Sequence, residues 1–205
     1  LVERLLPVHG EAGLLELAHS LNRGAPLDLR ANLMKTGRDE LLQALRDSGV
    51  EAAACTYSPC GVRLAGKPAL QKHPLFLSGN FEVQDEGSQL LGFLVQPRRG
   101  ELVVDFCAGA GGKTLQLGAM MRSTGRLYAF DVSDKRLAKL KPRFARAGLS
   151  NVHPVLIAHE RDAKVKKLAG KADRVLVDAP CSGLGTLRRN PDLKWRQTPA
   201  GIAEM

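Results

Sequence analysis

The second half of the chain alternates short apolar runs with longer amphipathic segments. Four runs are of strand type and lie at residues 102–105, 126–131, 152–157 and 175–178. Runs this short, bounded by turn residues, predict buried strands, and the segments between them predict the crossover helices of a parallel sheet. The pattern therefore predicts an α/β protein with a doubly wound, Rossmann-like parallel sheet.

The helix expected over residues 134–147 has clear end signals and one internal conflict. Ser133 can cap its start, and Gly148 provides the stop. Pro142 lies inside the segment, where proline removes a backbone donor. We therefore expect this helix to kink or to end early at Pro142.

The first half of the chain has shorter patterns, which predict a small α+β unit. The expected elements are helices over 1–22, 38–47 and 84–95, and strands over 27–33, 50–56 and 62–64. We divide the chain into a helical linker over 1–24, a small α+β unit over 25–75 and a larger α/β domain over 76–205.

Composition adds a basic surface to this picture. The 205 residues carry a net charge of +9 and a pI near 9.7. A basic surface attracts polyanions, of which nucleic acid is the commonest, although surplus lysine and arginine can also serve solubility alone. Charge by itself leaves both readings open.

Cysteine usage and hydropathy point to the cytoplasm. The four cysteines are too few and too scattered for a disulfide framework, and no histidine or second cysteine pair completes a zinc site, so we expect reduced thiols and no metal. No apolar run approaches the ~20 residues of a membrane span, and there is no signal peptide. The chain opens on Leu1 and not on Met, so we expect a segment of a longer cytoplasmic protein, acting as a monomer and not at a membrane.

The clearest candidate site is a glycine-rich turn between two strands. Asp105 ends the first strand, glycines follow at 109, 111 and 112, and Asp131 ends the next strand, 22 residues beyond Gly109. Glycines let the backbone approach a ligand, and an acid at the end of the second strand can accept ribose hydroxyls. A dinucleotide fingerprint would require a third glycine, where Thr114 stands.

The spacing instead favours S-adenosylmethionine as cofactor. Its amino and carboxyl ends would meet Asp105 and the turn, and its ribose would meet Asp131. The cofactor-binding residues that we expect from this spacing are Asp105, Cys107, Ala108, Gly109, Ala110, Gly111, Gly112 and Asp131.

A second candidate site follows the last strand. The run Val175-Leu176-Val177 leads into Asp178-Ala179-Pro180-Cys181, which places a carboxylate and a thiol at the carboxyl end of a buried strand. Pro180 stiffens the turn between them. The alternative for Cys181 is a buried structural thiol, and the neighbouring cofactor turn favours a chemical role.

Four motifs in order resemble the RNA cytosine-5 methyltransferases of the Fmu/NOL/Sun family, and the resemblance covers nearly the whole chain. They are Leu29-Arg30-Ala31-Asn32, Val83-Gln84-Asp85-Glu86-Gly87-Ser88-Gln89, the turn from Asp105 to Thr114, and the run from Val177 to Thr186 that continues to Trp195.

The resemblance implies transfer of a methyl group to C5 of a cytosine in RNA, through a cysteine adduct at C6. Ribosomal RNA is the commonest bacterial target of the family, and tRNA is an alternative. Asp178 occupies the place of the acid that contacts the ring near N3 and the cofactor side of the pocket, and Cys181 that of the thiol that helps release the product. The resemblance thus also implies that Lys113 and Asp178 bind the cofactor. Lys113 matches a lysine that orders the site, although a solvated lysine is an equal alternative. The fold implied is that of an S-adenosylmethionine-dependent methyltransferase without its C-terminal strands, preceded by an RNA-binding-like α+β unit.

Three departures from the family pattern bear on activity. Gly109-Ala110 replaces the usual Ala-Pro, and no acid follows the third strand directly, so we assign no residue to adenine. The attacking cysteine of the family stands in a Thr-Cys pair, which these 205 residues do not contain. We expect Cys107 to be structural and the chain alone to bind cofactor weakly and not to turn over.

Basic residues near the second candidate site are the expected RNA contacts. They are Arg188, Arg189 and Lys194, together with Arg30 of the small unit. For the basic helix over 134–147 a solvated face is the alternative, and we expect Trp195 to pack under its loop. Two other function classes stay open: a non-catalytic RNA-binding module that keeps the fold, and a small-molecule methyltransferase, against which the basic surface argues.

Overall fold

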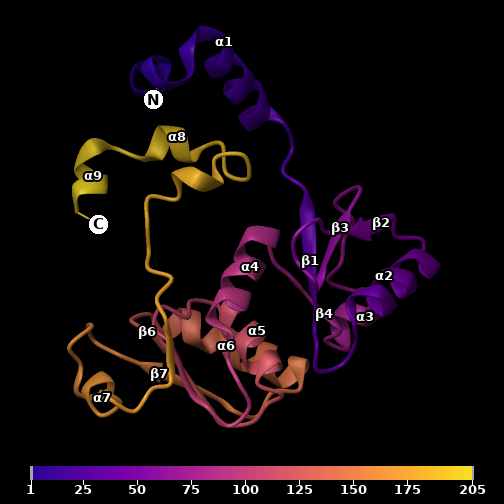
Figure 1. Ribbon diagram of the computed structural model, residues 1–205, viewed down its shortest axis with the longest axis vertical. Helices are drawn as coiled ribbons and strands as arrows, with labels where there is room; N and C mark the ends of the chain where they lie inside the picture. Colours follow the sequence, from indigo (N-terminus) through magenta and orange to yellow (C-terminus); the bar gives the residue numbers. More distant parts are fainter. Residues whose placement is uncertain (1, 205) are drawn as a thin grey trace. The chain divides into compact units, whose positions relative to one another are not determined.

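The computed structural model describes residues 2–204, which form two compact units. The core unit spans Pro26–Ala179, and the terminal unit combines the chain up to Ala25 with the chain from Pro180 onward (Figure 1). Leu1 and Met205, which the expected linker and α/β domain include, lie outside the described residues.

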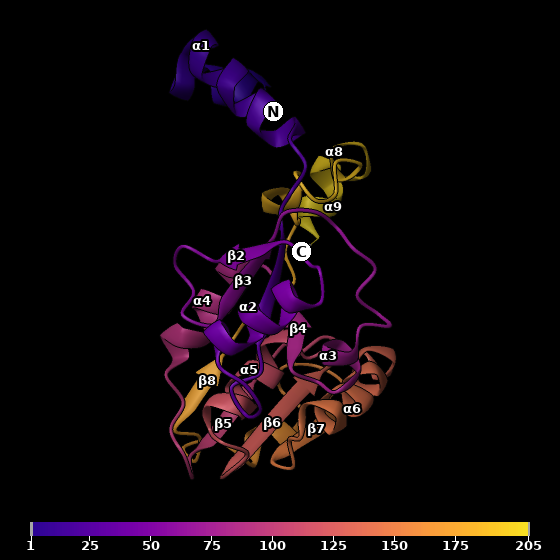
Figure 2. The same ribbon diagram turned by 90° about the vertical axis from the view of Figure 1, so that its right-hand side faces the viewer.

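A parallel sheet forms the larger half of the core unit. Its strands are β5 (Leu102–Asp105), β6 (Arg126–Asp131), β7 (Val152–Leu156) and β8 (Arg174–Leu176), in the order β7-β6-β5-β8. Figure 2 shows the four strands side by side. This order is that of a doubly wound fold, whose strand order reverses between β5 and β8. The prediction of a parallel, Rossmann-like sheet is confirmed.

Alternate residues of each strand face different layers of the core. Val103 and Leu127 pack with α5 (Gly112–Met120) and α6 (Asp134–Ala147), whereas Val104 and Phe130 pack on the opposite face. That second face is covered by residues of and around the short helix α7 (Ala163–Lys166). Strands β5 and β6 are covered on both faces and read as continuous apolar runs. The expectation that the last strand is buried is wrong, because Val175 of β8 is 54% exposed.

The structure of helix α6 differs from its prediction in two details. It continues through Pro142 to Ala147 and closes on Gly148, whose φ is 77°. Pro142 and Ala138 are exposed, so water can solvate the Ala138 carbonyl that loses its partner, and the expected early end does not occur. Ser133 takes the N-cap position, but its side chain makes no capping hydrogen bond.

A small antiparallel sheet forms the other half of the core unit. Its elements are β1 (Leu27–Ala31), α2 (Arg38–Asp47), β2 (Ala52–Ala54), β3 (Gly61–Leu64), α3 (Pro74–Leu77) and β4 (Phe81–Val83). The strand order β2-β3-β1-β4 is ferredoxin-like. Strand β4 lies beyond residue 75, where the sequence placed the boundary, because three residues are too short to show a periodic pattern.

Buried polar contacts join the two sheets of the core unit. Glu82 of β4 accepts hydrogen bonds from Arg143 and Arg146 of α6. Asn32 and Lys35, which follow β1, donate to the Ala147 and Arg146 carbonyls at the end of that helix. A cation and an amide donor suit the orphan carbonyls and negative dipole of a helix C-terminus, so the small sheet caps α6.

The terminal unit consists of helices and loops. It comprises α1 (Val2–Asn22), which breaks at Gly10, the 3₁₀ turn η1 (Leu184–Thr186), α8 (Leu193–Arg196) and α9 (Pro199–Ala203). Trp195 is 80% exposed, so the expectation that it packs under its loop is wrong. Among residues 2–204, no helix is both long enough and apolar enough to cross a bilayer.

Candidate functional site

A cavity of about 280 Å3 opens in the core unit where β5 and β8 end. Ligands of doubly wound sheets bind at such a reversal of strand order. The cavity is lined by Gln84, Ser88, Asp105, Cys107, Ala108, Gly109, Ala110, Gly112, Lys113 and Asp178. The fold thus brings most of the predicted cofactor residues together. Gly111 and Asp131 are not part of this lining.

The glycine-rich turn needs its glycines for different reasons. Gly109 and Gly111 have φ angles of 57° and 87°, which other residues rarely adopt. A Cβ on Gly111 would also lie 2.1 Å from Cδ1 of Leu140, whereas a Cβ on Gly109 would meet nothing within 4 Å. Gly111 therefore lets the turn pack directly against α6, and Gly109 provides backbone freedom only.

Asp105 is a buried acid at the base of the cavity. It is 1% exposed, and its Oδ2 accepts a hydrogen bond of 2.6 Å from the Thr114 hydroxyl. Burial raises the pKa of Asp105 to about 6, and the Thr114 hydrogen bond and the Lys113 charge only partly offset that effect. A cationic ligand group beside Asp105 would favour its ionised form.

Asp131 braces the turn from its other side. Its two carboxylate oxygens accept hydrogen bonds from the backbone N–H groups of Gly109 (2.9 Å) and Ser133 (2.7 Å). Each oxygen keeps a further lone pair with which it could accept a hydroxyl. The ribose contact of Asp131 stays a prediction.

Lys113 and Asp178 form an ion pair across the cavity. Lys113 Nζ lies 2.6 Å from Asp178 Oδ2 and 3.3 Å from Ser88 Oγ. The lysine side chain is 14% exposed and the aspartate side chain 46%. Lys113 is thus directed at Asp178 and away from solvent, which favours the site-ordering reading over the solvated one.

The four cysteines are free thiols in different environments. Burial raises the pKa of Cys107, so its thiol stays protonated, which favours a structural role. Cys181 is exposed and belongs to the terminal unit, and its catalytic role stays a prediction. Cys55 and Cys60 are buried in the core unit.

Cys55 lies in a cluster whose donor atoms approach within 4.8 Å of one another, together with Asp28 and Glu86. Arg63 donates to both carboxylates, at 2.7 Å to Asp28 and 3.2 Å to Glu86. The second oxygen of Glu86 accepts backbone N–H groups of Tyr57 and Ser58. The cluster therefore fits a buried ion pair better than a cation site.

The expected RNA contacts separate into buried and exposed residues. Arg30 is 3% exposed and donates to Gln84 and to the Gly112 carbonyl, so its assignment to RNA is corrected: the guanidinium is enclosed by protein. Arg188 donates to the Arg23 and Gly24 carbonyls of its own unit. Arg189 and Lys194 are exposed, and their RNA contacts stay predictions.

Two residues that line the cavity were not predicted, namely Gln84 and Ser88. The signal was available, because both belong to the motif over 83–89, but the sequence offered no reason to assign them a contact. Asp162, which follows the third strand, does not line this cavity. It accepts the Ala158 and Lys164 N–H groups and caps α7.

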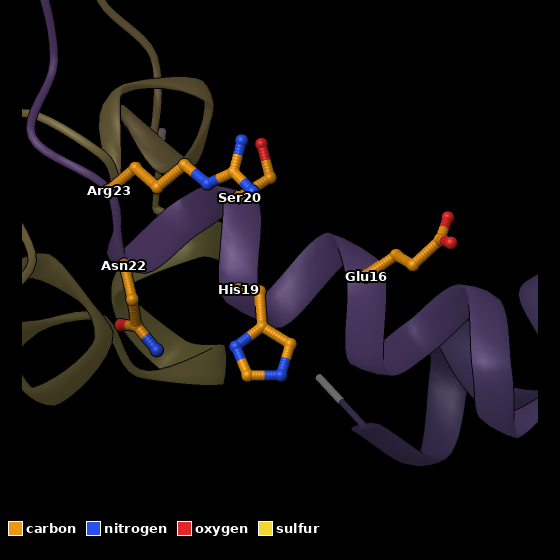
Figure 3. A pocket seen from close by; sticks show the side chains of 5 residues that line it. All are labelled: Glu16, His19, Ser20, Asn22 and Arg23. Carbon is orange, nitrogen blue, oxygen red and sulfur yellow. The ribbon is translucent and has the colours of Figure 1, made fainter.

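A second hollow lies along helix α1 of the terminal unit. Its five lining residues, Glu16, His19, Ser20, Asn22 and Arg23, all come from this helix and its end. Figure 3 shows the Glu16 carboxylate directed away from the His19 ring. None of the predicted site residues lies here, and the side chains do not converge as a binding site requires.

Comparison with known proteins decides the family. A family model described as 16S rRNA methyltransferase RsmB/F matches residues 92–205, and a model of the ferredoxin-like domain of RsmF/B-like methyltransferases matches residues 1–71. The chain belongs to the RsmB/F methyltransferase family. The expected resemblance is thereby confirmed, and so is the cofactor class of this family, S-adenosylmethionine.

Individual relatives agree with this assignment. The probable ribosomal RNA small subunit methyltransferase B of Synechocystis is 39% identical over the whole chain, which covers 46% of that protein. The crystal structure of PH0851 is 32% identical with a TM-score of 0.88, covering 99% of this chain and 46% of the other. A methyltransferase homolog from Pyrococcus horikoshii is 30% identical with a TM-score of 0.77, covering 91% of this chain and 60% of the other. The chain thus spans about half the length of the curated relative that it matches throughout.

Proposed function

We propose that this chain carries the cofactor site, and part of the catalytic machinery, of an enzyme that methylates C5 of a cytosine in ribosomal RNA. Family membership supports the coarse class, rRNA methylation. The finer proposal rests on one observation. The buried acid Asp105, the glycine turn and the Lys113–Asp178 pair meet in one cavity at the reversal of strand order.

The residues of the cavity fit S-adenosylmethionine. Burial raises the pKa of Asp105, and the charge of Lys113 only partly offsets this effect. The amino group of the cofactor would provide a further cation beside Asp105. Gly109 and Gly112 line the cavity without side chains, so the backbone of the turn can approach a ligand there, while Gly111 packs the turn against Leu140 of α6. We assign the ribose to Asp131, whose bonds to the turn already place it beside Gly109.

The bound cofactor supplies a methyl group activated by a sulfonium. On the RNA base, a thiolate would add to C6, and the electron pair released toward C5 would form the bond to the methyl group as the bond between that group and the sulfonium sulfur breaks, which leaves a neutral thioether. The proton of C5 would then pass to a base, and the C6–S bond would break with its electron pair returning to the thiolate, which restores the ring. The base must be unpaired or flipped to reach such a site.

Asp178 and Lys113 act on the base in this proposal. Asp178 contacts the ring near N3, and the 2.6 Å contact with Lys113 holds its carboxylate in place for that purpose. Cys181 takes part in product release. Because these 205 residues contain no Thr-Cys pair, we assign the attack on C6 to neither Cys107 nor Cys181.

Two measurements test the proposal. Calorimetric titration of the 205-residue chain with S-adenosylmethionine is expected to show binding, and absence of binding would overturn the cofactor assignment. The protein produced from its complete gene is expected to form 5-methylcytosine in unmodified 16S rRNA, mapped by bisulfite sequencing. Methylation of another base, or of another atom of cytosine, would contradict the C5 assignment.

The chain alone and an Asp178→Asn variant sharpen the assignment. The 205-residue chain is expected to give no sustained turnover with the same RNA, and turnover would show that one of its own cysteines attacks. Asp178→Asn in the complete protein is expected to reduce turnover more than it reduces cofactor affinity, because the proposed contact with the base adds to the place of Asp178 on the cofactor side of the cavity.

A further inference from the structure

Arg30 is a buried cation that the proposed reaction does not use. It lies on β1, an inner strand of the small sheet, and is 3% exposed. Its Nη1 donates to Oε1 of Gln84 and, at 2.7 Å, to the carbonyl of Gly112. Burial lowers the pKa of Arg30 to about 10, so the guanidinium remains charged at neutral pH. A buried charge is costly unless hydrogen bonds compensate it, so the Gln84 oxygen and the Gly112 carbonyl are held within hydrogen-bond distance of Arg30.

The contact with Arg30 decides which way the Gln84 amide points. A guanidinium only donates, so the atom of Gln84 that faces it must be the carbonyl oxygen, and the NH2 group must point elsewhere. The backbone of Gln84 is held as well. Its N–H donates to the Asp28 carbonyl at 3.0 Å, and its carbonyl accepts from Gln89 Nε2 at 2.8 Å. The NH2 group is therefore fixed in direction.

That NH2 group faces the start of helix α5 inside the cavity. Gln84 is 8% exposed and lines the cavity, and its Nε2 lies 3.8 Å from the position that a Cβ on Gly112 would take. The hydrogen bonds of residues 2–204 provide no acceptor for Nε2. A nearly buried donor thus points, without a partner, toward a ligand position.

Helix α5 adds donors at the same place. The helix has nine residues, and its first internal bond is from Leu115 N to the Gly111 carbonyl. The N–H groups before Leu115 have no partner within the helix, and its dipole favours an anion at this end. The cavity therefore combines an anion-binding end, at Gln84 and α5, with the cation-binding acid Asp105. These two ends match the carboxylate and the ammonium of an α-amino acid.

Given the proposed cofactor, we propose that Gln84 donates its amide hydrogens to the carboxylate at the cofactor's amino-acid end. Arg30 is the positioning residue that holds Gln84 and Gly112 for this contact. Arg30 does not line the cavity and acts only through these two groups. The small ferredoxin-like sheet thereby contributes to cofactor affinity.

Two ligands that differ in the amino-acid end test the proposal. S-adenosylhomocysteine has this end, and 5′-deoxy-5′-methylthioadenosine has the same adenosine and thioether without it. The substitution Gln84→Glu keeps an acceptor for Arg30 but removes both donors. It is expected to weaken binding of S-adenosylhomocysteine about tenfold or more, the effect of losing a hydrogen bond to a charged group, and to leave methylthioadenosine affinity nearly unchanged. Equal changes for both ligands, or none, would overturn the proposal.

Arg30 and a control complete the design. Arg30→Met is expected to reproduce the selective loss, and Arg30→Lys to restore part of the affinity, since lysine can still donate to one of the two oxygens. If Arg30→Met does not fold, Gln84→Glu decides alone. Gln96→Glu adds the same charge at an exposed position outside the cavity and is expected to change neither affinity. If neither ligand binds to the unaltered chain, the proposed function is overturned and not merely this assignment.

Discussion

The ion pairs of the core unit and of the terminal unit differ in how far they are exposed to solvent. In the core unit, Glu82 is 4% exposed and pairs with Arg143 and Arg146, whose side chains are only 24% and 21% exposed. In the terminal unit, the Arg196–Asp192 pair has side-chain exposures of 74% and 52%. The two Glu82 pairs join strand β4 of the small sheet to helix α6, whereas the Arg196–Asp192 pair spans one turn of a surface helix.

This difference changes how the basic character of the chain is read. Helix α6 carries six cations, but Arg143 and Arg146 serve Glu82, and Arg143 also donates to the Ala110 carbonyl of the cofactor turn. Arg30 is likewise internal. Net charge therefore overstates how many cations are available to RNA, and the exposed residues of the terminal unit remain the better candidates.

Breaking the Glu82 pairs is expected to have the largest effect. Glu82→Gln keeps the shape but leaves two partly buried arginines without a counter-charge, which should lower the free energy of unfolding by about 3–5 kcal/mol. Denaturant unfolding of the core unit within the intact chain measures it. A loss under about 1 kcal/mol would mean that solvent compensates these arginines and that the contrast between the units is smaller than burial indicates.

The buried carboxyl of Asp105 has no pair of arginines beside it as Glu82 has, so its effect on stability should depend on pH. Its folded pKa of about 6 lies above the unfolded value, so the protonated form is favoured. The contribution to stability is complete below about pH 4 and is lost as pH rises through 6. Asp105→Asn should therefore leave stability unchanged near pH 4 and raise it by up to about 3 kcal/mol at pH 8.

Cofactor binding provides the opposing readout for the same variant. Asp105→Asn is expected to weaken S-adenosylmethionine binding at pH 8, because the ammonium loses its carboxylate. The stability difference between Asp105→Asn and the unaltered chain should be larger at pH 8 than at pH 4. An equal difference at both pH values would contradict the raised pKa of Asp105.

Exposed cations should act on RNA and not on folding. Lys194→Ala is expected to lower affinity for single-stranded RNA several-fold at low salt and to reduce the slope of log affinity against log salt by about 0.7, the effect of one phosphate contact. Filter binding over a KCl series measures both. The control is Lys67→Ala, an equally exposed lysine of the small unit, and an equal effect there would indicate a non-specific basic surface.

The exposed ion pair of the terminal unit should contribute least. Asp192→Asn removes the partner of Arg196 at the surface, where water replaces it, so the free energy of unfolding is expected to change by less than about 0.5 kcal/mol. A loss comparable to that of Glu82→Gln would end the distinction between the two units.

The local pattern was sufficient for the parallel sheet and its turn. Strands β5 and β6 occupy the predicted residues, since strands covered on both faces are continuous apolar runs. Asp105 and the glycines were predicted because a cofactor turn requires them at fixed spacing, and their role stays a prediction. Strand β4 was missed because three residues carry no period, and of the two outcomes expected at Pro142 the early end does not occur, because exposure at Pro142 is a tertiary property.

The sequence by itself determined the family, the order of the parallel strands along the chain and the spacing of the turn from Asp105 to Lys113, because these depend on neighbours along the chain. Only the tertiary structure decided which charges are internal. Arg30 and Arg189 read alike in sequence, yet Arg30 is enclosed by Gln84 and Gly112, which lie 54 and 82 residues away. Burial depends on such distant contacts, and it is burial that removes Arg30 from the candidate RNA ligands.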